Sequence, residues 1–116
     1  MSLKVYYLDD EKDLCENFLD GFSTERIRIQ TFTDPEMALR EVKMSPPDLF
    51  LIDYRLPGAN GDQIAQAIDP AIPKVLVTGD ISVQTQYSFQ RIFSKPYSMD
   101  EMERFLSECL VKKTGH

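Results

Sequence analysis

Two apolar runs that lead directly into carboxylates dominate the hydrophobic pattern of the chain. Residues 49–52 are all apolar and are followed at once by Asp53, and the largely apolar run 4–8 is followed by Asp9 and Asp10. A short apolar run bounded by turn residues is typical of a strand buried on both faces, as in parallel sheets covered by helices. We therefore predict two central strands that deliver acidic side chains to the same edge of a sheet.

Three further segments have the pattern of strands. Residues 26–32 alternate apolar and polar side chains, which favours a half-exposed edge strand. Residues 74–80 form a further buried strand that ends in small and polar residues, and residues 91–94 form a last short strand before Lys95-Pro96. The pattern thus predicts five strands, the third of which ends at Asp53.

Helical periodicity fills the intervals between most of these strands. Apolar residues of the first predicted helix share one face, namely Leu14, Cys15, Phe18, Leu19 and Phe22. Asp34-Pro35 supplies a capping residue and a first-turn proline for the second helix. A short third helix follows the turn cluster 57–61, and Ser98 with Glu101 forms a capping box for the last.

The interval 81–89 departs from this periodicity, because its apolar residues alternate with polar ones at a period nearer two than 3.6. The order of elements nevertheless asks for a helix between the fourth and fifth strands, so we predict a short or irregular one. Strands that alternate with helices through right-handed crossovers give an α/β fold with a doubly wound parallel sheet.

Composition narrows the class of protein. The 116 residues suffice for one domain, and 13 basic against 19 acidic residues give a net charge of −6. The longest basic run is Lys112-Lys113, so direct binding to nucleic acid or to an anionic membrane is not expected. With no apolar run of the roughly 20 residues that span a bilayer and no signal-peptide pattern, we expect a cytoplasmic protein.

Cysteine and histidine chemistry is sparse. Cys15 and Cys109 both fall among apolar residues of predicted helices, which indicates buried free thiols. The only histidine is the last residue, His116. A zinc site and a Ser-His-Asp triad are therefore excluded, since neither has its full set of residues.

The predicted strand ends bring together a chemically coherent set of side chains. The set consists of Asp9, Asp10, Asp53, Thr78 and Lys95. Crowded carboxylates favour a hard divalent cation with oxygen ligands, most plausibly Mg²⁺. An aspartate can attack phosphorus as a nucleophile, while a lysine and a hydroxyl stabilise the phosphoryl oxygens. Each residue alone has an ordinary structural explanation, so the conjunction carries the functional prediction.

This set resembles the site of the receiver domain of two-component response regulators, and the resemblance covers essentially the whole chain. Leu56-Pro57 followed by Gly61 is similar to the turn that such domains carry after the phosphorylated aspartate. The resemblance implies a single receiver domain over 1–116. It also implies a flavodoxin-like sheet with strand order 2-1-3-4-5 and helices on both faces.

The resemblance further implies roles for the site residues. Asp53 would accept a phosphoryl group from a histidine kinase or histidine phosphotransfer protein. Mg²⁺ would be bound by Asp10, Asp53 and the backbone carbonyl of Arg55, with Asp9 acting through a metal-bound water. Such a domain is not a turnover enzyme on an external substrate, although it would hydrolyse its own acyl phosphate.

The switch that the resemblance implies depends on Thr78 and Lys95. Lys95 would pair with Asp53 and then with the phosphoryl oxygens, and the Lys95-Pro96 bond would be cis. Thr78 would move toward the phosphoryl group and couple it to the surface of the fourth helix, fifth strand and fifth helix. The family's usual switch aromatic lies three residues before the lysine, where this chain has Ile92.

Because of that departure, we expect output to depend on backbone shifts or on Phe93 or Tyr97. Gly79 beside the threonine would loosen its loop. Arg55 and Asp80 stand two residues beyond Asp53 and Thr78, at positions that tune acyl-phosphate lifetime in this family. A modified lifetime is expected, in a direction that the sequence does not give.

Three alternatives compete with this interpretation. A haloacid-dehalogenase-like phosphatase needs a second acid where this chain has Arg55, and a flavin-binding protein would not place Asp-Asp-Glu at its phosphate loop. A receiver-fold docking module that works without phosphate is compatible with the sequence. The sequence does not distinguish a single-domain regulator, a phosphorelay shuttle and a receiver excised from a longer protein. It also leaves open the kinase, the pathway, the output partner and the oligomeric state.

Overall fold

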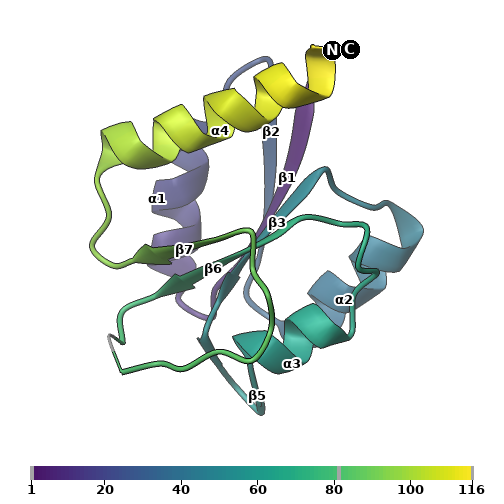
Figure 1. Cartoon of the computed structure of the whole chain (residues 1–116), viewed down its shortest axis with the longest axis vertical. Helices are drawn as coiled ribbons and strands as arrows, with labels where there is room; N and C mark the ends of the chain where they lie inside the picture. The colour runs from purple at the N-terminus through teal and green to yellow at the C-terminus, as the bar shows by residue number, and fades with distance from the viewer. Residues whose placement is uncertain (1, 81, 116) are drawn as a thin grey trace.

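A computed structural model describes residues 2–80 and 82–115, and these form a parallel five-stranded sheet with the order β2-β1-β3-β6-β7 (Figure 1). The strands are β1 (Leu3–Leu8), β2 (Ile27–Phe32), β3 (Leu49–Asp53), β6 (Lys74–Thr78) and β7 (Arg91–Ser94). When only these five strands are numbered along the chain, the order across the sheet is the predicted 2-1-3-4-5. The flavodoxin-like, doubly wound fold is confirmed.

Within the described ranges, four helices cover the two faces of the sheet. They are α1 (Lys12–Phe22), α2 (Pro35–Met44), α3 (Gly61–Gln66) and α4 (Met99–Thr114). Buried side chains of α1 and α4 share one apolar cluster with β1, β3, β6 and β7. Those of α2 and α3 share a second cluster on the other face. Every residue of β3 and β6 is buried, as expected for central strands covered on both sides.

The helix starts follow the capping signals of the sequence. The Asp34 side chain accepts a hydrogen bond from the Glu36 N–H, with Pro35 in the first turn of α2. The Ser98 hydroxyl accepts from the Glu101 N–H at the start of α4. These caps satisfy N–H groups that have no partner within the helix, so local chemistry sets both boundaries.

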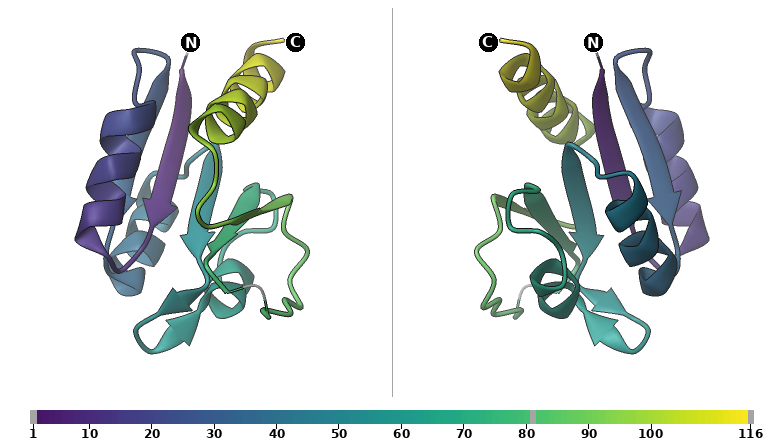
Figure 2. Two further views of the ribbon diagram at one scale, coloured as in Figure 1. Left: turned by 90° about the vertical axis from the view of Figure 1, so that its left-hand side faces the viewer. Right: turned by 90° about the vertical axis from the view of Figure 1, so that its right-hand side faces the viewer.

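The turn cluster after Asp53 forms a small antiparallel hairpin, β4 (Arg55–Leu56) with β5 (Ala59–Asn60), that projects beyond the main sheet (Figure 2). Gly58 at its tip has φ of 74°, a conformation that glycine tolerates. A Cβ at Gly61 would lie 2.8 Å from Leu76 Cδ1 and 3.2 Å from the Asp53 carbonyl oxygen. Gly61 therefore lets α3 start directly behind the strand that carries Asp53.

The predicted helix between β6 and β7 is wrong over the described part of that interval, because residues 82–90 contain neither helix nor strand. The alternation of apolar residues explains the difference, since Tyr87 and Phe89 both turn toward the α2/α3 cluster, where their rings lie 4.9 Å apart between centroids at an angle of 59°. The surface expected from a fourth helix, fifth strand and fifth helix consists instead of residues 82–90, β7 and α4. Ile81 lies outside the described residues.

Polar contacts hold residues 82–90, hereafter the β6–β7 segment, against the fold. The Asp62 carboxylate on α3 accepts from the Thr85 hydroxyl and, at 2.7 Å, from the Gln86 N–H. The Lys74 side chain is buried, and its Nζ donates to the Tyr87 hydroxyl at 2.9 Å. It also donates to the backbone carbonyls of Asp69 and Ile72. Side-chain hydrogen bonds thus do the positioning that a helix would otherwise do.

Candidate functional site

The carboxylates of Asp9, Asp10 and Asp53 meet at the carboxyl edge of the sheet. Ligand atoms of all three lie within 4.8 Å of one another. Asp9 is fully buried, Asp53 is 8% exposed and Asp10 faces solvent. This oxygen donor set, open to water on one side, fits a hard divalent cation such as Mg²⁺, which keeps several waters when bound.

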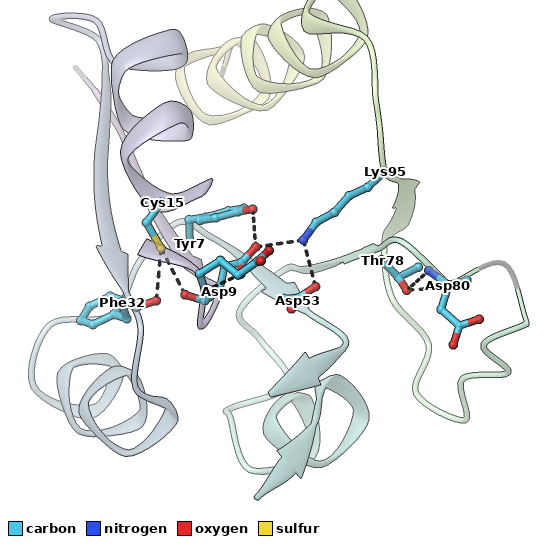
Figure 3. Close-up of polar contacts among 9 residues, drawn as sticks. Tyr7, Asp9, Cys15, Phe32, Asp53, Thr78, Asp80 and Lys95 are labelled. Carbon is cyan, nitrogen blue, oxygen red and sulfur yellow. Dashed lines mark hydrogen bonds and ion pairs between the residues drawn. The ribbon is translucent and has the colours of Figure 1, made fainter. Parts of the chain in front are cut away.

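Lys95 lies between two of these acids (Figure 3). Its Nζ is 2.9 Å from Asp9 Oδ2 and 3.2 Å from Asp53 Oδ1. The Lys95 N–H donates to the Thr78 carbonyl at 2.7 Å, and the Lys95-Pro96 bond is cis, as the resemblance to receiver domains implied. The backbone of Lys95 is therefore fixed where β6 and β7 end, and its side chain reaches across to Asp53.

Asp9 anchors the site from inside the protein. Its Oδ1 accepts from the Glu11 N–H and its Oδ2 accepts from the Tyr7 hydroxyl, each at 3.0 Å. Sequence analysis did not single out Tyr7. The available signal was its spacing, since Asp9 directly follows the strand and a residue two positions before it in extended chain faces the same side of the sheet. Tyr7 thus fixes the carboxylate that in turn holds Lys95.

The charges of these groups shift one another's pKa values. Burial raises the pKa of Asp53 to about 6, and the neighbouring Asp9 carboxylate adds to the rise while Lys95 opposes it. Burial lowers the pKa of Lys95, but hydrogen bonds and charge from Asp9 and Asp53 outweigh it, so the pKa lies above its usual value. Lys95 is therefore a firmly protonated cation, and Asp53 is a carboxylate held in an unfavourable environment.

Thr78 ends β6 on the other side of Asp53, and its side chain is buried. Its Oγ1 accepts from the Asp80 N–H at 3.0 Å (Figure 3). Asp80 in turn forms an ion pair with the Arg55 guanidinium on β4. The threonine hydroxyl is thus tied to the start of the β6–β7 segment.

An open cleft of about 610 Å³ connects these groups to solvent. It is lined by Asp10, Glu11, Asp53, Arg55, Thr78, Gly79, Asp80 and Lys95. All predicted site residues except Asp9 and Ile92 therefore border one cleft. Asp9 lies beneath it and contacts Lys95, which lines the cleft.

Ile92 does not border this cleft. It lies on the edge strand β7 opposite Leu76 and is 49% exposed. Phe93 points to the opposite face of the sheet, where it is buried and packs edge-to-face on Tyr97 and Phe105. Thr78 therefore shares the face of Ile92 and not that of Phe93, and the dependence of output on backbone shifts, Phe93 or Tyr97 stays a prediction.

Both cysteines are free thiols, Cys15 buried and Cys109 half-buried. The Cys15 thiol donates to the Asp9 carbonyl, and burial raises its pKa to about 11, so it is an unreactive packing residue. Over the part of the chain that is described, no helix combines the length and apolar character needed to span a membrane.

Comparison with known sequences gives a consistent result. A model of the response regulator receiver domain family matches residues 5–107. The C4-dicarboxylate transport transcriptional regulatory protein DctD of Rhizobium meliloti is 27% identical over 84% of this chain, and the DNA-binding response regulator MtrA of Mycobacterium tuberculosis is 26% identical over 88%. This chain spans 23% of the length of DctD and 48% of that of MtrA.

Solved structures agree on the fold. The signal receiver domain of an HD domain-containing protein from Pseudomonas fluorescens Pf-5 superposes with a TM-score of 0.88 at 18% identity and covers all of both chains. The response regulator TrrA from Thermotoga maritima, in complex with Mg²⁺ and BeF, gives a TM-score of 0.81 at 22% identity over 94% of this chain and 99% of its own. The family match over residues 5–107, together with the acid–lysine cluster at the carboxyl edge of the sheet, places this chain in the response regulator receiver domain family.

Proposed function

We propose that Asp53 accepts a phosphoryl group from the phosphohistidine of a histidine kinase or histidine phosphotransfer protein. The observation that carries the proposal is the placement of Asp53 beside two further carboxylates and within 3.2 Å of the Lys95 ammonium, at the mouth of an open cleft. An Asp53 carboxylate oxygen attacks phosphorus, the P–N bond breaks, and its electron pair leaves on the histidine ring nitrogen.

Mg²⁺ would be held by Asp10, Asp53 and the backbone carbonyl of Arg55, with Asp9 acting through a bound water. When bound, the cation neutralises charge on the transferring phosphoryl oxygens. The exposed Asp10 and the buried Asp53 offer carboxylate oxygens that lie within 4.8 Å of each other and both border the cleft.

Lys95 has two successive functions in this proposal. Before transfer it balances the charges of Asp9 and Asp53, which keeps Asp53 ionised against the effect of burial. After transfer its ammonium binds a phosphoryl oxygen while Asp9 keeps it in place. Thr78 would donate its hydroxyl to a second phosphoryl oxygen once its bond with Asp80 is broken.

Receiver domains are signalling domains and not substrate-turnover enzymes. We propose that water ends the signal here by attacking the phosphorus of the acyl phosphate, which regenerates the Asp53 carboxylate and inorganic phosphate. Arg55 and Asp80 border the path of that water from the cleft, so their side chains would set its rate.

The output surface proposed here consists of the β6–β7 segment, β7 and α4. Its partner is a protein or an attached effector domain. The names of the curated relatives describe transcriptional and DNA-binding regulators. Given the net charge of −6, we expect that direct contact with DNA is not a property of this chain.

A receiver-fold docking module that works without phosphate is the second candidate. The irregular β6–β7 segment and the exposed Ile92 favour it, because both differ from the switch that this fold usually carries. Partner binding that is unchanged by Mg²⁺ and a phosphodonor would support this candidate over the first.

Intact-mass measurement after incubation with acetyl phosphate, with and without Mg²⁺, tests the main proposal. We expect a Mg²⁺-dependent, base-labile phosphoryl adduct on the unchanged protein and on Asp20→Asn, an exposed aspartate of α1 that serves as control. Asp53→Asn should give no adduct. An adduct that persists in Asp53→Asn would contradict the assignment, and absence of an adduct even with a panel of histidine kinases would favour the docking module.

A further inference from the structure

The Asp80 carboxylate connects the phospho-acceptor cleft to the β6–β7 segment. Its Oδ2 forms the ion pair with Arg55. Its Oδ1 accepts from the Ser82 N–H at 2.9 Å and from the Ser82 hydroxyl at 2.5 Å. Asp80 thus links Arg55 on β4 to Ser82 at the start of the segment through hydrogen bonds of one carboxylate. Phosphoryl transfer to Asp53 does not itself require these contacts.

Arg55 is free to change partner. Its side chain is 73% exposed, so its pair with Asp80 is an exposed ion pair of the kind that contributes little to stability. Arg55 and Asp53 border the same cleft and are two residues apart. Hydrogen bonding and charge from Asp80 raise the Arg55 pKa, and the Asp53 charge adds to the rise, so the guanidinium already lies in the field of both acids.

We propose that phosphorylation of Asp53 draws the Arg55 guanidinium from Asp80 to the phosphoryl group and so releases the start of the β6–β7 segment. This inference rests on the proposed function. A phosphoryl group adds a charge of about −1.5 to −2 and three acceptor oxygens, which a planar guanidinium binds in bidentate fashion. One singly charged carboxylate on the surface competes poorly with that group.

A second bond to Asp80 is lost in the same event. The Thr78 hydroxyl now accepts from the Asp80 N–H, and Thr78 would turn that hydroxyl toward the phosphoryl oxygens. The Asp80 carboxylate then loses Arg55 at the same time as the Asp80 N–H loses the Thr78 hydroxyl. A phosphoryl group on Asp53 therefore acts on one residue by two routes, one through β4 and one through β6.

The release should stop partway along the segment. Asp62 holds Thr85 and Gln86, and Lys74 holds Tyr87, and neither Asp62 nor Lys74 borders the phospho-acceptor cleft. Once Arg55 and Thr78 no longer hold Asp80, its carboxylate can rotate away from Ser82, so we expect Ser82 to lose its hydrogen bonds while Gln86 keeps its own. Arg55 is thus a positioning residue that passes the charge at Asp53 to a short, defined stretch of backbone.

Amide hydrogen exchange followed by NMR, with Mg²⁺ and beryllofluoride as a phosphoryl mimic, tests this inference. Bound beryllofluoride is observed independently by its ¹⁹F signal. Exchange at Ser82 should become about fivefold faster on binding, which corresponds to about one exposed ion pair, while exchange at Gln86 changes less than about twofold.

Variants at Arg55 distinguish an exchange of partners by its guanidinium from a static ion pair with Asp80. In Arg55→Gln, Ser82 should exchange rapidly without beryllofluoride and respond little to it, whereas Arg55→Lys should restore part of the response. Arg40→Gln, an exposed arginine on α2, should behave as the unchanged protein.

Two results would overturn the inference. Only the second would also contradict the assignment of Asp53 as the phospho-acceptor. A ¹⁹F signal of bound beryllofluoride with unchanged exchange at Ser82 would refute the exchange of partners and leave the phospho-acceptor assignment intact. Absence of both the ¹⁹F signal and the phosphoryl adduct would refute the proposed function and the inference with it.

Discussion

The acidic edge of the sheet and the β6–β7 segment are held in place in different ways. At the acidic edge, Lys95 bridges two buried carboxylates, and Tyr7 with a backbone amide fixes the inner one. Over the segment, a few hydrogen bonds with the side chains of Asp62 and Lys74 replace a helix. The first region is an electrostatic framework in which each charge needs the others. The second is a chain of separate anchors that can be released one at a time.

The largest effect on stability should come from Lys95→Ala. The substitution leaves the buried Asp9 and Asp53 without their cation, and removing one partner of a buried pair costs about 3–5 kcal/mol. Urea denaturation at pH 7 measures the loss. Lys12→Ala removes a lysine whose side chain is 82% exposed and should change the free energy of unfolding by less than about 0.5 kcal/mol. Equal losses of unfolding free energy in Lys95→Ala and Lys12→Ala would show that Lys95 does not stabilise the buried carboxylates.

Asp53→Asn should act in the opposite direction. The folded protein holds Asp53 at a pKa of about 6 against an ordinary 3.8, so between these values the folded state binds a proton that the unfolded chain does not. Stability from this group therefore falls as pH rises through this window. We expect Asp53→Asn to stabilise the protein by about 1–3 kcal/mol at pH 7, with the gain lost on acidification toward pH 4.

Denaturation of both proteins between pH 4 and pH 7 checks that prediction. If the gain in stability of Asp53→Asn does not depend on pH, packing and not ionisation explains why asparagine is more stable than aspartate at this position. Together with the loss of phosphorylation, a pH-dependent gain would show that the phospho-acceptor is kept ionised at a cost to stability.

Tyr87→Phe tests the anchors of the β6–β7 segment. It removes the hydroxyl that accepts from Lys74 and should cost about 1 kcal/mol, because a buried donor loses one of its partners. Amide exchange should rise at residue 87 itself, and it should stay unchanged at Gln86, which Asp62 holds, and at Ser82. The exposed Ser88→Ala serves as control. Faster exchange along the whole segment would show that its anchors do not act separately.

Ile92→Thr should have the smallest effect on stability. Ile92 is 49% exposed on an edge strand, and threonine keeps its β-branched shape, so we expect a change below about 0.5 kcal/mol in urea denaturation. Phe93→Ala, on the buried face of the same strand, should cost about 3–5 kcal/mol. A large loss at Ile92 would mean that the β6–β7 segment covers it in solution.

The sequence revealed the acidic edge well because its signals are local. Each reactive residue follows an apolar run, and parallel strands necessarily align their carboxyl ends. Tyr7 was missed because a tyrosine inside an apolar run is indistinguishable from any other core aromatic until its hydroxyl is seen to reach Asp9.

The β6–β7 segment was predicted less well because its structure depends on distant partners. The period-two pattern of 81–89 conflicted with a helix, but the expected order of elements was given more weight than the pattern. What replaces the helix is set by Asp62 and Lys74, which lie outside the segment in sequence. Lys74 within a strand pattern gave no sign that its ammonium would be buried against a tyrosine.

By itself, the sequence determined the α/β fold, the strand that carries Asp53 and the set of residues at the carboxyl edge, because hydrophobic periodicity and strand alignment are properties of short stretches. Only the tertiary structure decided which acid is buried, how Lys95 is shared and that Arg55 pairs with Asp80. These depend on distances between residues far apart in the chain, and on burial, which sets how strongly each charge acts on the next.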